Sequence, residues 1–548
     1  KTRFKPINEI YGDTTVLGQM PDWNPVEMIG RAPRALAFSL YKTLITDHAW
    51  RIARDKMGYD VPTGQPLMLS LAGQPYIDTR LSFHSFLPKD LSSGISKKLV
   101  NTWIRNLREK PELHDKIEFD IAITTYSFDI TDKIQNLIPG VLDEDEESEY
   151  KLVLKKQLCN LLKENNEGSI TNSLNQLEEL SNKQMLLKPD MNQACLNSLM
   201  RMIDECIQYG TVPFSILARH GFIARTLLFS LERLGILTAS DIEQVQSGIK
   251  TIAGELVDDM QGLQLGELAQ EEFMTRYGHL RPGTYDILSL RYDQVKDIFL
   301  NDISIIKKET TPLFSLEKYQ RKAINELIKI EELPWENADK LFDYIQEATA
   351  SREYGKFIFT KSVSDILEVI AAYGEYHGLS RDEMSHVPVN NLLEIASSVT
   401  EGNIEDRIRA IANRGVEEHA VCSAIRLPQV LFDEAGIHVI PFQVSYPNFI
   451  THKIISAQSV QLRTHEAPPV LVGKIVLIEN ADPGYDWIFA HSIAGLITKY
   501  GGANSHMAIR CAEFGIPAAI GCGEQQFEVL TKVDHILLDC SASVIQTI

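Results

Sequence analysis

The segment 498–521 constrains the fold of this chain more than any other, because it predicts a strand, a glycine-rich loop, a helix and a second strand in direct succession. The apolar residues of 494–497 predict a buried strand, and those of 518–520 predict the next one. Between them a helix is expected over about 506–514. This order sets one histidine, His506, in the first turn of the helix, directly behind the loop.

The ends of this helix carry local sequence signals. Gly501 and Gly502 predict the turn after the first strand, and Ser505 or Asn504 can cap the helix through a side-chain oxygen. Gly515 suits the position just past the helix, and a proline two residues later prevents the helix from continuing. The loop and the helix start together predict a place where backbone N–H groups hold a phosphate.

His506 has the chemistry to carry that phosphate. The unpaired N–H groups and the positive dipole end of a first helical turn favour negative charge. Neutral imidazole is a nucleophile and a good leaving group near neutral pH. Arg510 is the nearest cation that can balance the charge. The alternative is that His506 is only a polar residue near a helix start and that the glycines serve only the turn.

The pattern Gly-Gly-x-x-Ser-His-x-Ala-Ile-x-x-x-Glu-x-Gly-Ile-Pro-Ala, at 501–518, resembles the phosphohistidine motif of the PEP-utilising enzymes. These include pyruvate phosphate dikinase, PEP synthase, rifampicin phosphotransferase and the L-glutamine kinase-like proteins. The resemblance implies that His506 is the phosphorylated residue and that Ser505 and Arg510 assist it. One departure is that many members have Ala-Arg-Glu where this chain has Cys-Ala-Glu at 511–513. The implied phosphate loop consists of Gly501, Gly502 and Asn504.

Length and composition predict a folded protein of several domains. A chain of 548 residues is too long for one core, and 44% apolar residues suffice for globular folding. No window approaches ~18 uninterrupted apolar residues, so no membrane contact is expected. The seven cysteines contain no CxxC pair and fit free thiols in a reducing compartment, which predicts a cytoplasmic location. A formal charge of -20 repels nucleic acid phosphates, so no nucleic acid partner is expected.

The periodicity predicts a multidomain α+β fold, in which a large, mainly helical substrate domain precedes a small α/β domain. Residues 1–130 are expected to form a mixed α/β N-terminal part of the substrate domain, and residues 131–430 its helical part. Residues 431–450 are expected to be a linker, with a hinge near 441–451. Residues 451–548 are expected to form the last domain, and the resemblance implies that this is the swivelling phosphohistidine domain.

Local patterns predict individual elements. In the N-terminal part, apolar alternation predicts strands near 67–71, 76–83 and 117–128. Residues 242–260 predict helix. The acidic run 143–149 predicts a solvated loop between domains rather than an interaction patch, because like charges repel each other. Five short strands are expected in the last domain, at 454–456, 474–478, 495–498, 518–520 and 536–538.

The segment 273–287 interrupts a predicted helix with two glycines and a proline, which is costly inside a bundle. Such a break is expected where a loop projects polar groups into a cleft. The segment is similar to a Tyr-Gly-His-Arg-x-Pro-Gly-Glu-like stretch in the helical substrate domain of rifampicin phosphotransferase-like and L-glutamine kinase-like proteins. The alternative is a tight interhelical turn in which Arg281 and Asp286 merely pair. The candidate substrate-binding residues are His279, Arg281, Tyr285 and Asp286.

Other polar groups are further candidates for substrate binding. Arg352 and Lys356 could steady a travelling phosphoryl group, or equally they could lie on a solvated helix face. Asp78 with Arg80 could clamp an amino-acid-like group. Asp22, Asn24 and Glu27 form a third group, which could bind a substrate amine or a metal. Asp22 could equally just cap the following helix.

Three stretches, at 18–30, 71–83 and 447–451, resemble the L-glutamine kinase-like subgroup, so the chain is expected to be closest to it. Family members of this type carry an ATP-grasp domain ahead of the helical region, and this chain contains no Walker A loop. The resemblance therefore implies that ATP and Mg²⁺ bind on a domain outside this chain, in cis or in trans, and that no metal binds within it. The start without methionine suggests a fragment.

The resemblance implies an ATP-dependent phosphotransferase of the dikinase type. His506 would attack the β-phosphoryl group of ATP, and the swivelling domain would carry the phosphoryl group to a small-molecule acceptor on the helical domain. AMP and phosphate would be the other products. The expected acceptor is an L-glutamine-like amide or a hydroxyl group. The alternative is a phosphocarrier or a non-catalytic binding module that lacks its own donor domain.

Overall fold

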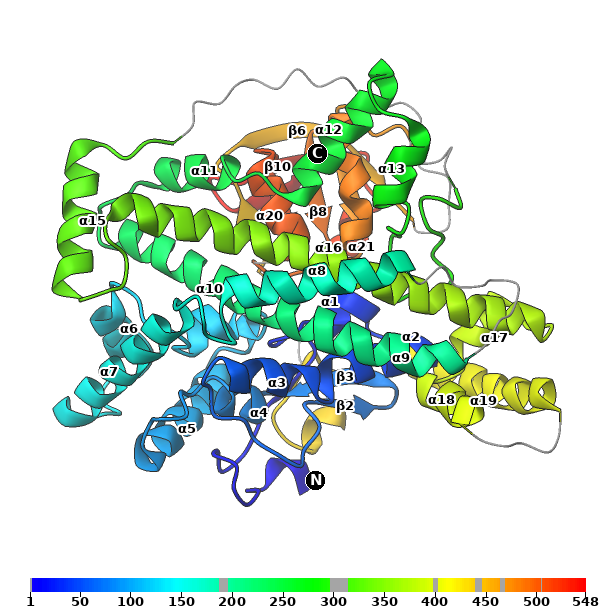
Figure 1. The fold of residues 1–548 in the computed structure, drawn as a ribbon, viewed down its shortest axis with the longest axis horizontal. Helices are drawn as coiled ribbons and strands as arrows, with labels where there is room; N and C mark the ends of the chain where they lie inside the picture. Colours follow the sequence, from blue (N-terminus) through cyan, green and yellow to red (C-terminus); the bar gives the residue numbers. More distant parts are fainter. Residues whose placement is uncertain are drawn as a thin grey trace.

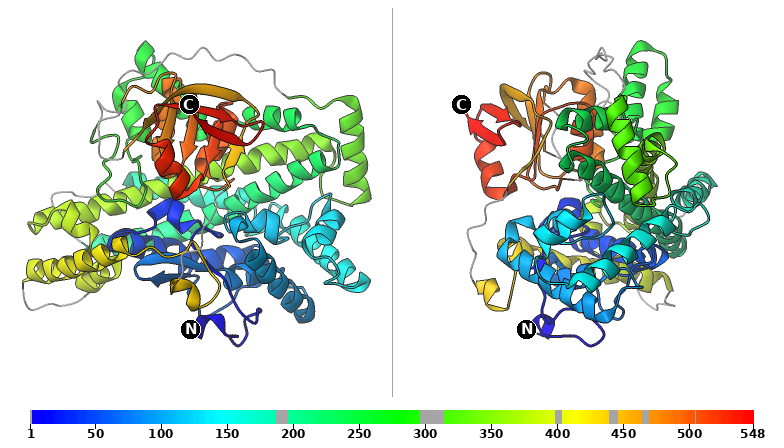
Figure 2. Two further views of the ribbon diagram at one scale, coloured as in Figure 1. Left: turned by 180° about the vertical axis from the view of Figure 1, so that it is seen from behind. Right: turned by 90° about the vertical axis from the view of Figure 1, so that its left-hand side faces the viewer.

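The structure is a computed structural model that describes residues 2–186, 196–295, 314–397, 403–438, 446–463, 469–503 and 505–548. Helices fill the middle of the molecule, the N-terminal part lies below them in Figure 1, and the C-terminal sheet region lies above. Figure 2 shows from the side that the C-terminal sheet region rests against one face of the helices. The predicted fold class, a large helical region followed by a small α/β region, is confirmed.

The N-terminal part contains an antiparallel sheet of four strands in the order β2-β3-β1-β4. β2 (Met68–Leu71) and β3 (Gln74–Asp78) form a hairpin, and the short β1 (Leu17–Gly18) lies between β3 and β4 (Val430–Leu431). Because β4 follows the helical region, this sheet joins both ends of that region. The surrounding helices and turns are η1 (Thr2–Phe4), α1 (Pro25–Ile29), α2 (Ala35–Tyr41), η2 (Lys42–Thr46), α3 (Ala49–Lys56), α4 (Thr79–His84), α5 (Ser93–Glu109), η3 (Pro111–Leu113) and η4 (Ile117–Ile121).

Two of the three strands expected in the N-terminal part need correction. The strand at 67–71 is present as β2, but the strand expected over 76–83 ends at Asp78, whose carboxylate accepts from the backbone N–H of Arg80 and starts α4. The strand expected at 117–128 is wrong. Residues 117–121 form the π-helical turn η4, which places Ile117 and Ile121 together in the core.

The helical region is organised around α16 (Ala338–Tyr376), a helix of 39 residues that is buried on most of its faces. A helix that is apolar nearly all round is expected at the centre of a core. Figure 1 shows α8 and α10 lying along it. The other helices are α6 (Ile130–Leu137), α7 (Glu144–Leu161), α8 (Ile170–Leu186), α9 (Asn197–Cys206), η5 (Ile207–Thr211), α10 (Val212–Arg233), α11 (Ala239–Ser247), α12 (Ile252–Leu265), α13 (Gln270–Tyr277), α15 (Lys318–Ile330), α17 (Arg381–Ser385), α18 (Val389–Ser397) and α19 (Ile404–Ala424).

Two expectations for this region are also corrected. The acidic run 143–149 does not form a loop but starts α7, because Asp143 and Glu146 form a capping box and the first helical turn favours acidic side chains. The helical pattern 242–260 is split into α11 and α12. The four residues between them leave the helical path, and Thr251 among them takes part in the site described below.

The C-terminal region contains a mixed sheet of seven strands in the order β11-β10-β6-β7-β8-β9-β5. Strands β6 to β9 run parallel, and the other pairings are antiparallel. All five predicted strands are present, as β6 (Ile454–Gln461), β7 (Ile475–Ile478), β8 (Gly495–Thr498), β9 (Ala518–Ile520) and β10 (His535–Asp539). The remaining elements are η6 (Ala435–His438), β5 (Asn448–Ile450), η7 (Pro483–His491), α20 (His506–Glu513), α21 (Gly523–Leu530) and β11 (Val544–Thr547).

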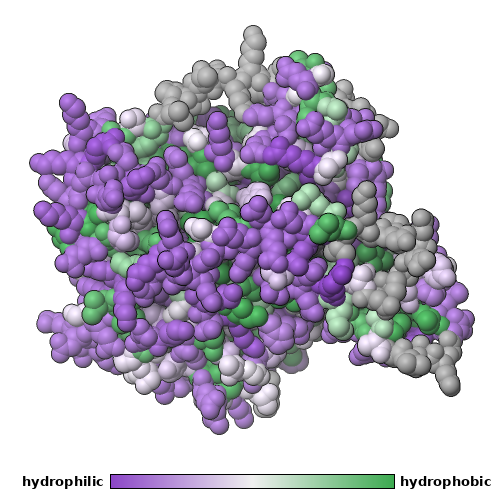
Figure 3. Space-filling view, viewed as in Figure 1, coloured by the Kyte–Doolittle hydropathy of each residue, from purple (hydrophilic) through white to green (hydrophobic). Residues whose placement is uncertain are grey.

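The sequence did not predict β5 and β11, and β5 falls inside the predicted linker 431–450. Residues 441–445 of the predicted hinge lie outside the described residues, so the hinge and the domain limits stay predictions. Among the described residues no helix is long and apolar enough to cross a membrane. The six described cysteines are all free. Polar side chains cover most of the face in Figure 3, and apolar residues are scattered among them.

Candidate active site

The helix that carries His506 follows strand β8 and has well-defined ends. The Ser505 hydroxyl accepts from the backbone N–H of Ala508 at 3.3 Å and caps the N-terminus, as expected. At the other end Gly515 has a φ of +60°, and the N–H of Ile516 bonds the carbonyl of Cys511. This is a Schellman motif, in which the left-handed residue favours glycine. The predicted cap Asn504 lies outside the described residues.

Two glycines fix the loop that precedes the helix. Gly501 has a φ of +139°, and a Cβ atom there would lie 2.9 Å from the Ile520 side chain. A Cβ atom on Gly521 would lie 2.2 Å from the Gly501 carbonyl oxygen. The loop before His506 and the end of β9 therefore pack backbone against backbone, which only glycine permits. This contact holds the start of α20 in a fixed place.

His506 lies between two carboxylates and is only 3% exposed. Its Nδ1 atom is 2.8 Å from Glu353 Oε2, and its Nε2 atom is 2.6 Å from Asp486 Oδ1. Asp486 belongs to η7, in the same C-terminal region as His506, whereas Glu353 belongs to α16 in the helical region. The histidine is therefore held between its own region and the helical region.

Arg510 closes this cluster from the second turn of α20. Its guanidinium donates to Glu353 Oε2 at 2.8 Å and to Glu513 Oε2 at 2.6 Å, and it also bonds the Thr251 hydroxyl. Its Nε atom lies 3.4 Å from His506 Nε2. Arg510 is fully buried, and Glu353, then Glu513, raise its pKa against the opposing effect of burial. Arg510 therefore lies beside His506 and between two carboxylates, and its part in balancing the charge of a phosphoryl group stays a prediction.

Glu353 is held as a carboxylate. Burial acts to raise its pKa, but Arg510, Arg352 and His506 outweigh burial and hold the pKa far below its usual range. Arg352 Nη1 lies 2.6 Å from the other oxygen of Glu353. An ionised carboxylate only accepts hydrogen bonds. The Nδ1 atom of His506 therefore carries the proton in this arrangement.

Two further charged residues, Lys356 and Glu27, interact electrostatically with each other and with this group. Lys356 is 6% exposed, and its ammonium group makes no hydrogen bond or ion pair with any described residue. Burial lowers its pKa, and Glu27, Glu353 and Asp482 oppose that effect. Glu27, on α1, accepts from Asn24 Nδ2 at 3.3 Å, and burial raises its pKa.

The glycine loop reaches these residues. The backbone of Gly502 interacts with the Glu27 carboxylate, and a Cβ atom on Gly502 would lie 3.5 Å from Asn24 Nδ2. Asn24 itself has a φ of 45°, an uncommon conformation for a residue other than glycine. We call the whole group the buried charge cluster; its members are Glu27, Arg352, Glu353, Lys356, Asp486, His506 and Arg510.

A loop of the helical region docks onto η7 beside this cluster. Thr284 donates to Asp482 through its backbone N–H at 3.0 Å and through its hydroxyl at 3.1 Å. The Tyr292 hydroxyl donates to the Gly484 carbonyl at 2.6 Å. A Cβ atom on Gly484 would lie 1.9 Å from the Arg281 carbonyl oxygen, so the two backbones touch directly. An apolar cluster continues this interface and joins α12 and α13 to η7 and α20.

Residues 471–543 match the family model described as PEP-utilising enzyme, mobile domain. This match supports the PEP-utilising enzyme family. We call these residues the mobile domain. The match contains His506, Asp486 and Arg510, but it does not extend to the helical region. No curated protein matches the chain. The L-glutamine kinase-like subgroup therefore stays a prediction.

The loop residues predicted from 273–287 lie next to the mobile domain, but their own side chains make structural contacts. Arg281 bonds Glu368 at 2.7 Å and Ser364, and it does not pair with the Asp286 carboxylate. That carboxylate accepts from the backbone N–H of Leu288. His279 packs edge-on against Phe357, and burial, followed by Lys361 and Arg291, lowers its pKa well below the usual value. Tyr285 packs edge-on against Tyr41, with ring centroids 5.2 Å apart.

Asp78 and Arg80 lie together and are fully buried, with 3.5 Å between Asp78 Oδ2 and Arg80 Nη2. Asp78 accepts from Thr15, and Arg80 donates to the carbonyls of Arg3 and Lys5. The pair thus anchors the N-terminal segment. Asp22 was expected to bind a substrate amine or a metal, or else to cap the following helix. It bonds Arg54 at 2.7 Å and does not cap α1, whose N-cap is Asn24. Substrate binding by all these residues stays a prediction.

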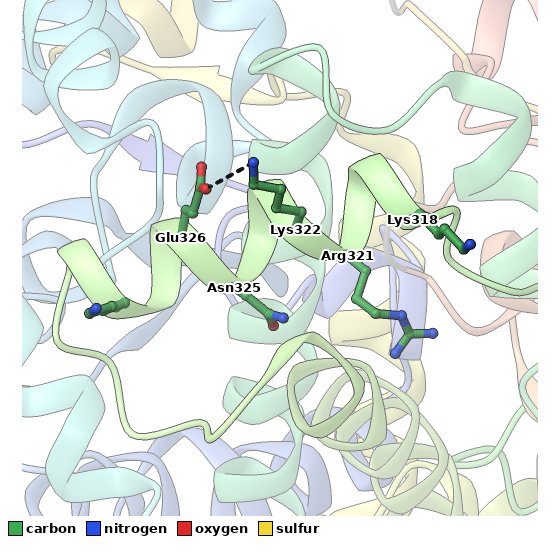
Figure 4. A pocket seen from close by; sticks show the side chains of 6 residues that line it. Lys318, Arg321, Lys322, Asn325 and Glu326 are labelled. Atoms are coloured by element: carbon green, nitrogen blue, oxygen red, sulfur yellow. Dashed lines mark ion pairs between the residues drawn. The ribbon is translucent and has the colours of Figure 1, made fainter.

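The described residues contain no group of three or more His, Cys, Asp or Glu side chains that could hold a metal ion. A surface hollow lies along α15, at the edge of the molecule in Figure 1, away from α20. Figure 4 shows that basic side chains dominate it and that Lys322 pairs with Glu326 at 3.8 Å. It includes no candidate residue from the sequence. The hollow is lined by Lys318, Arg321, Lys322, Asn325, Glu326 and Lys329.

Three residues of the site were missed by the sequence analysis: Glu353, Asp486 and Thr251. In the sequence Glu353 stands between Arg352 and Lys356, the two candidate cations of α16. A carboxylate between two candidate cations could have pointed to Glu353 as a site residue. Asp486 follows a Pro-Gly turn close before strand β8, but nothing in that pattern distinguishes it from a surface residue. Thr251 lies inside the stretch 242–260, for which the sequence predicted one continuous helix, so no signal in the sequence pointed to it.

Proposed function

We propose that this chain is the acceptor-binding and phosphoryl-carrying part of an ATP-dependent phosphotransferase of the dikinase type. The observation that carries the proposal is the contact of His506 with Glu353. A histidine at a helix start in the mobile domain reaches, at 2.8 Å, a helix of another region that offers Arg352 and Lys356 on either side of Glu353. That arrangement suits a carrier residue seen at its delivery position.

In the donor step, ATP binds on an ATP-grasp domain in cis or in trans, together with Mg²⁺, which there neutralises phosphate charge. His506 attacks the β-phosphoryl group through Nε2, a nitrogen–phosphorus bond forms, and AMP leaves. Water then releases the terminal phosphate, and a phosphohistidine remains. Because His506 is only 3% exposed in the docked arrangement, the mobile domain leaves the helical region for this step.

In the delivery step, the mobile domain docks as described here. Glu353 accepts the Nδ1 proton of His506, so Nε2 is the atom that bears the phosphoryl group. Asp486, now 2.6 Å from Nε2, yields its place to that group. Arg510, Arg352 and Lys356 supply the positive charge that phosphoryl transfer requires. The nitrogen–phosphorus bond breaks and its electron pair returns to Nε2.

Glu27 is the proposed base for the acceptor. It is a carboxylate on a fixed helix, it contacts the backbone of the histidine loop, and burial raises its pKa toward the range useful for proton transfer. It takes the proton of an acceptor hydroxyl, or of an L-glutamine-like amide, as the new bond to phosphorus forms.

Glu27→Gln is expected to slow discharge of the phosphohistidine to an acceptor about 10²-fold, the usual contribution of a general base. The wild-type rate should fall as the pH falls through the pKa of Glu27, which lies above the ordinary carboxyl value, because only the ionised form accepts a proton. The variant should lose this acidic limb. The measurement is the pH profile of phosphohistidine loss with L-glutamine or another acceptor from a screen.

Glu109→Gln, at an exposed position on α5, is the matched control and should keep both the rate and the acidic limb. An unchanged acidic limb in Glu27→Gln would remove Glu27 from the role of base. Equal rates of phosphohistidine formation from ATP in both variants would show that the donor step is intact.

The reaction type is tested by product analysis of the chain supplied with an ATP-grasp domain, fused to it or added in trans. With Mg-ATP and an acceptor, phosphorus NMR should show AMP and phosphate appearing in equal amounts, together with the phosphorylated acceptor. ADP as the main nucleotide product would contradict the dikinase scheme. Phosphohistidine formation without discharge to any acceptor would favour a phosphocarrier.

A further inference from the structure

A second group of arginines and aromatic rings adjoins the buried charge cluster. The Arg352 guanidinium lies over the Phe222 ring of α10, 5.8 Å from its centroid, and Phe222 meets Phe119 of η4 edge-on at 5.6 Å. Arg225 lies over the Phe119 ring at 5.8 Å. Gly221 makes room, because a Cβ atom there would lie 2.9 Å from the Arg352 side chain. Three elements, α10, α16 and η4, thus converge here.

The charges of this group do not balance. Arg352 pairs with Glu353 at 2.6 Å, and Arg219, which also lies over the Phe222 ring, pairs with Glu118 at 2.9 Å. Arg225 forms no hydrogen bond and no ion pair with any described residue. Burial lowers its pKa to about 10, Asp120 opposes that effect without reaching ion-pair distance, and Arg352 adds to it to a smaller extent. One cation therefore has no ion-pair partner among the described residues.

The unbalanced cation lies close to the reaction centre. Arg352, which shares Phe222 with this group, bonds the same carboxylate that holds His506. The segment that carries Phe119 also borders the histidine loop, because a Cβ atom on Gly502 would lie 3.5 Å from the Asp115 carbonyl oxygen. Phe119, Phe222 and Arg225 are each partly exposed, so a ligand can touch them.

We propose that Arg225, Phe119 and Phe222 bind the acceptor, and that the acceptor is a carboxylic acid with a planar ring. The inference rests on the proposed function and names its substrate class. A buried or half-buried cation is stabilised by a paired anion, and a carboxylate fits the guanidinium fork. One uncompensated positive charge matches the single charge of a carboxylate better than the double charge of a phosphate. The half-buried phenyl rings offer a face or an edge to a ring of the ligand.

Titration calorimetry of the full chain, without ATP, tests the proposal with three probes of one shape: phenylacetate, phenylacetamide and phenyl phosphate. Phenylacetate should bind, and phenylacetamide, which lacks the charge, should bind at least tenfold more weakly. Arg225→Gln should weaken phenylacetate binding at least tenfold, and Arg225→Lys should weaken it less. Arg105→Gln, an exposed arginine on α5, is the matched control and should bind as the wild type does.

Several outcomes would overturn the proposal. They are the absence of phenylacetate binding, equal binding of phenylacetamide, tighter binding of phenyl phosphate, or full binding by an Arg225→Gln chain. If Lys356→Met abolishes phenylacetate binding and Arg225→Gln does not, the carboxylate occupies the phosphoryl position instead. Circular dichroism of each variant shows whether it is folded. Phosphohistidine formation from ATP does not require this subsite. A failure to form phosphohistidine would therefore count against the proposed function and not against this inference.

Discussion

Glu353→Gln is expected to leave phosphorylation of His506 intact and to slow its discharge about 10²-fold, because a small misplacement of the reacting nitrogen has an effect of that size. Glu353 accepts the Nδ1 proton of His506 and bonds both Arg352 and Arg510. Glutamine keeps the shape but loses the charge that fixes the tautomer. Removing one partner from a buried ion pair also weakens the docked arrangement, by about 3–5 kcal/mol.

The matched control is Glu347→Gln, at an exposed position on the same helix, which should discharge at the wild-type rate. Both steps are followed on one sample, first by the acquisition of acid-labile phosphate and then by its loss after an acceptor is added. Equal slowing of both steps would place the role of Glu353 in folding rather than in delivery. Wild-type discharge by the Gln variant would contradict the delivery position proposed for α16.

Gly484→Ala is expected to separate the mobile domain from the helical region. The added methyl group would lie 1.9 Å from the Arg281 carbonyl oxygen, and a backbone atom cannot give way as a flexible side chain can. His506 should then become accessible, and its modification by diethyl pyrocarbonate, measured by mass spectrometry, should be at least tenfold faster. Discharge to an acceptor should be lost, and phosphorylation from ATP should persist.

Gly94→Ala is the control, because a Cβ atom at Gly94 meets open space on α5. It should leave the modification of His506 unchanged. An unchanged modification rate in Gly484→Ala would mean that the backbone contact does not hold the mobile domain in place. Loss of phosphorylation together with discharge would show instead that the mobile domain is misfolded.

The part of the site that the sequence predicted is the part governed by neighbouring residues. The strands on either side of α20, its Ser505 cap and its Gly515 end follow from local rules of turns and caps, and the structure has all of them. A glycine that a close contact requires, such as Gly501, can also be recognised in the sequence, because glycines after a strand predict a turn. Such rules act over a few residues, so one sequence is enough to apply them.

The partners of His506 could not be predicted in this way. Glu353 lies 153 positions from His506 in the sequence, and only the docking of two regions brings the two together. The strand predicted over 117–128 is wrong for a related reason. Its alternating apolar residues match a strand, but the packing of Ile117 and Ile121 against helices of the core favours a π-helical turn. Arg281 likewise pairs with Glu368 on α16, a contact between residues far apart in the sequence.

The most direct measurement is the phosphorylation of His506 itself. The chain, supplied with an ATP-grasp domain fused to it or added in trans, is incubated with Mg-ATP labelled in the β-phosphate, and the acid-labile label on the protein is counted and mapped. We expect about one label per chain on His506 in the wild type and none in His506→Asn. A wild-type chain that stays unlabelled, or a His506→Asn chain that acquires an equal acid-labile label, would contradict this expectation.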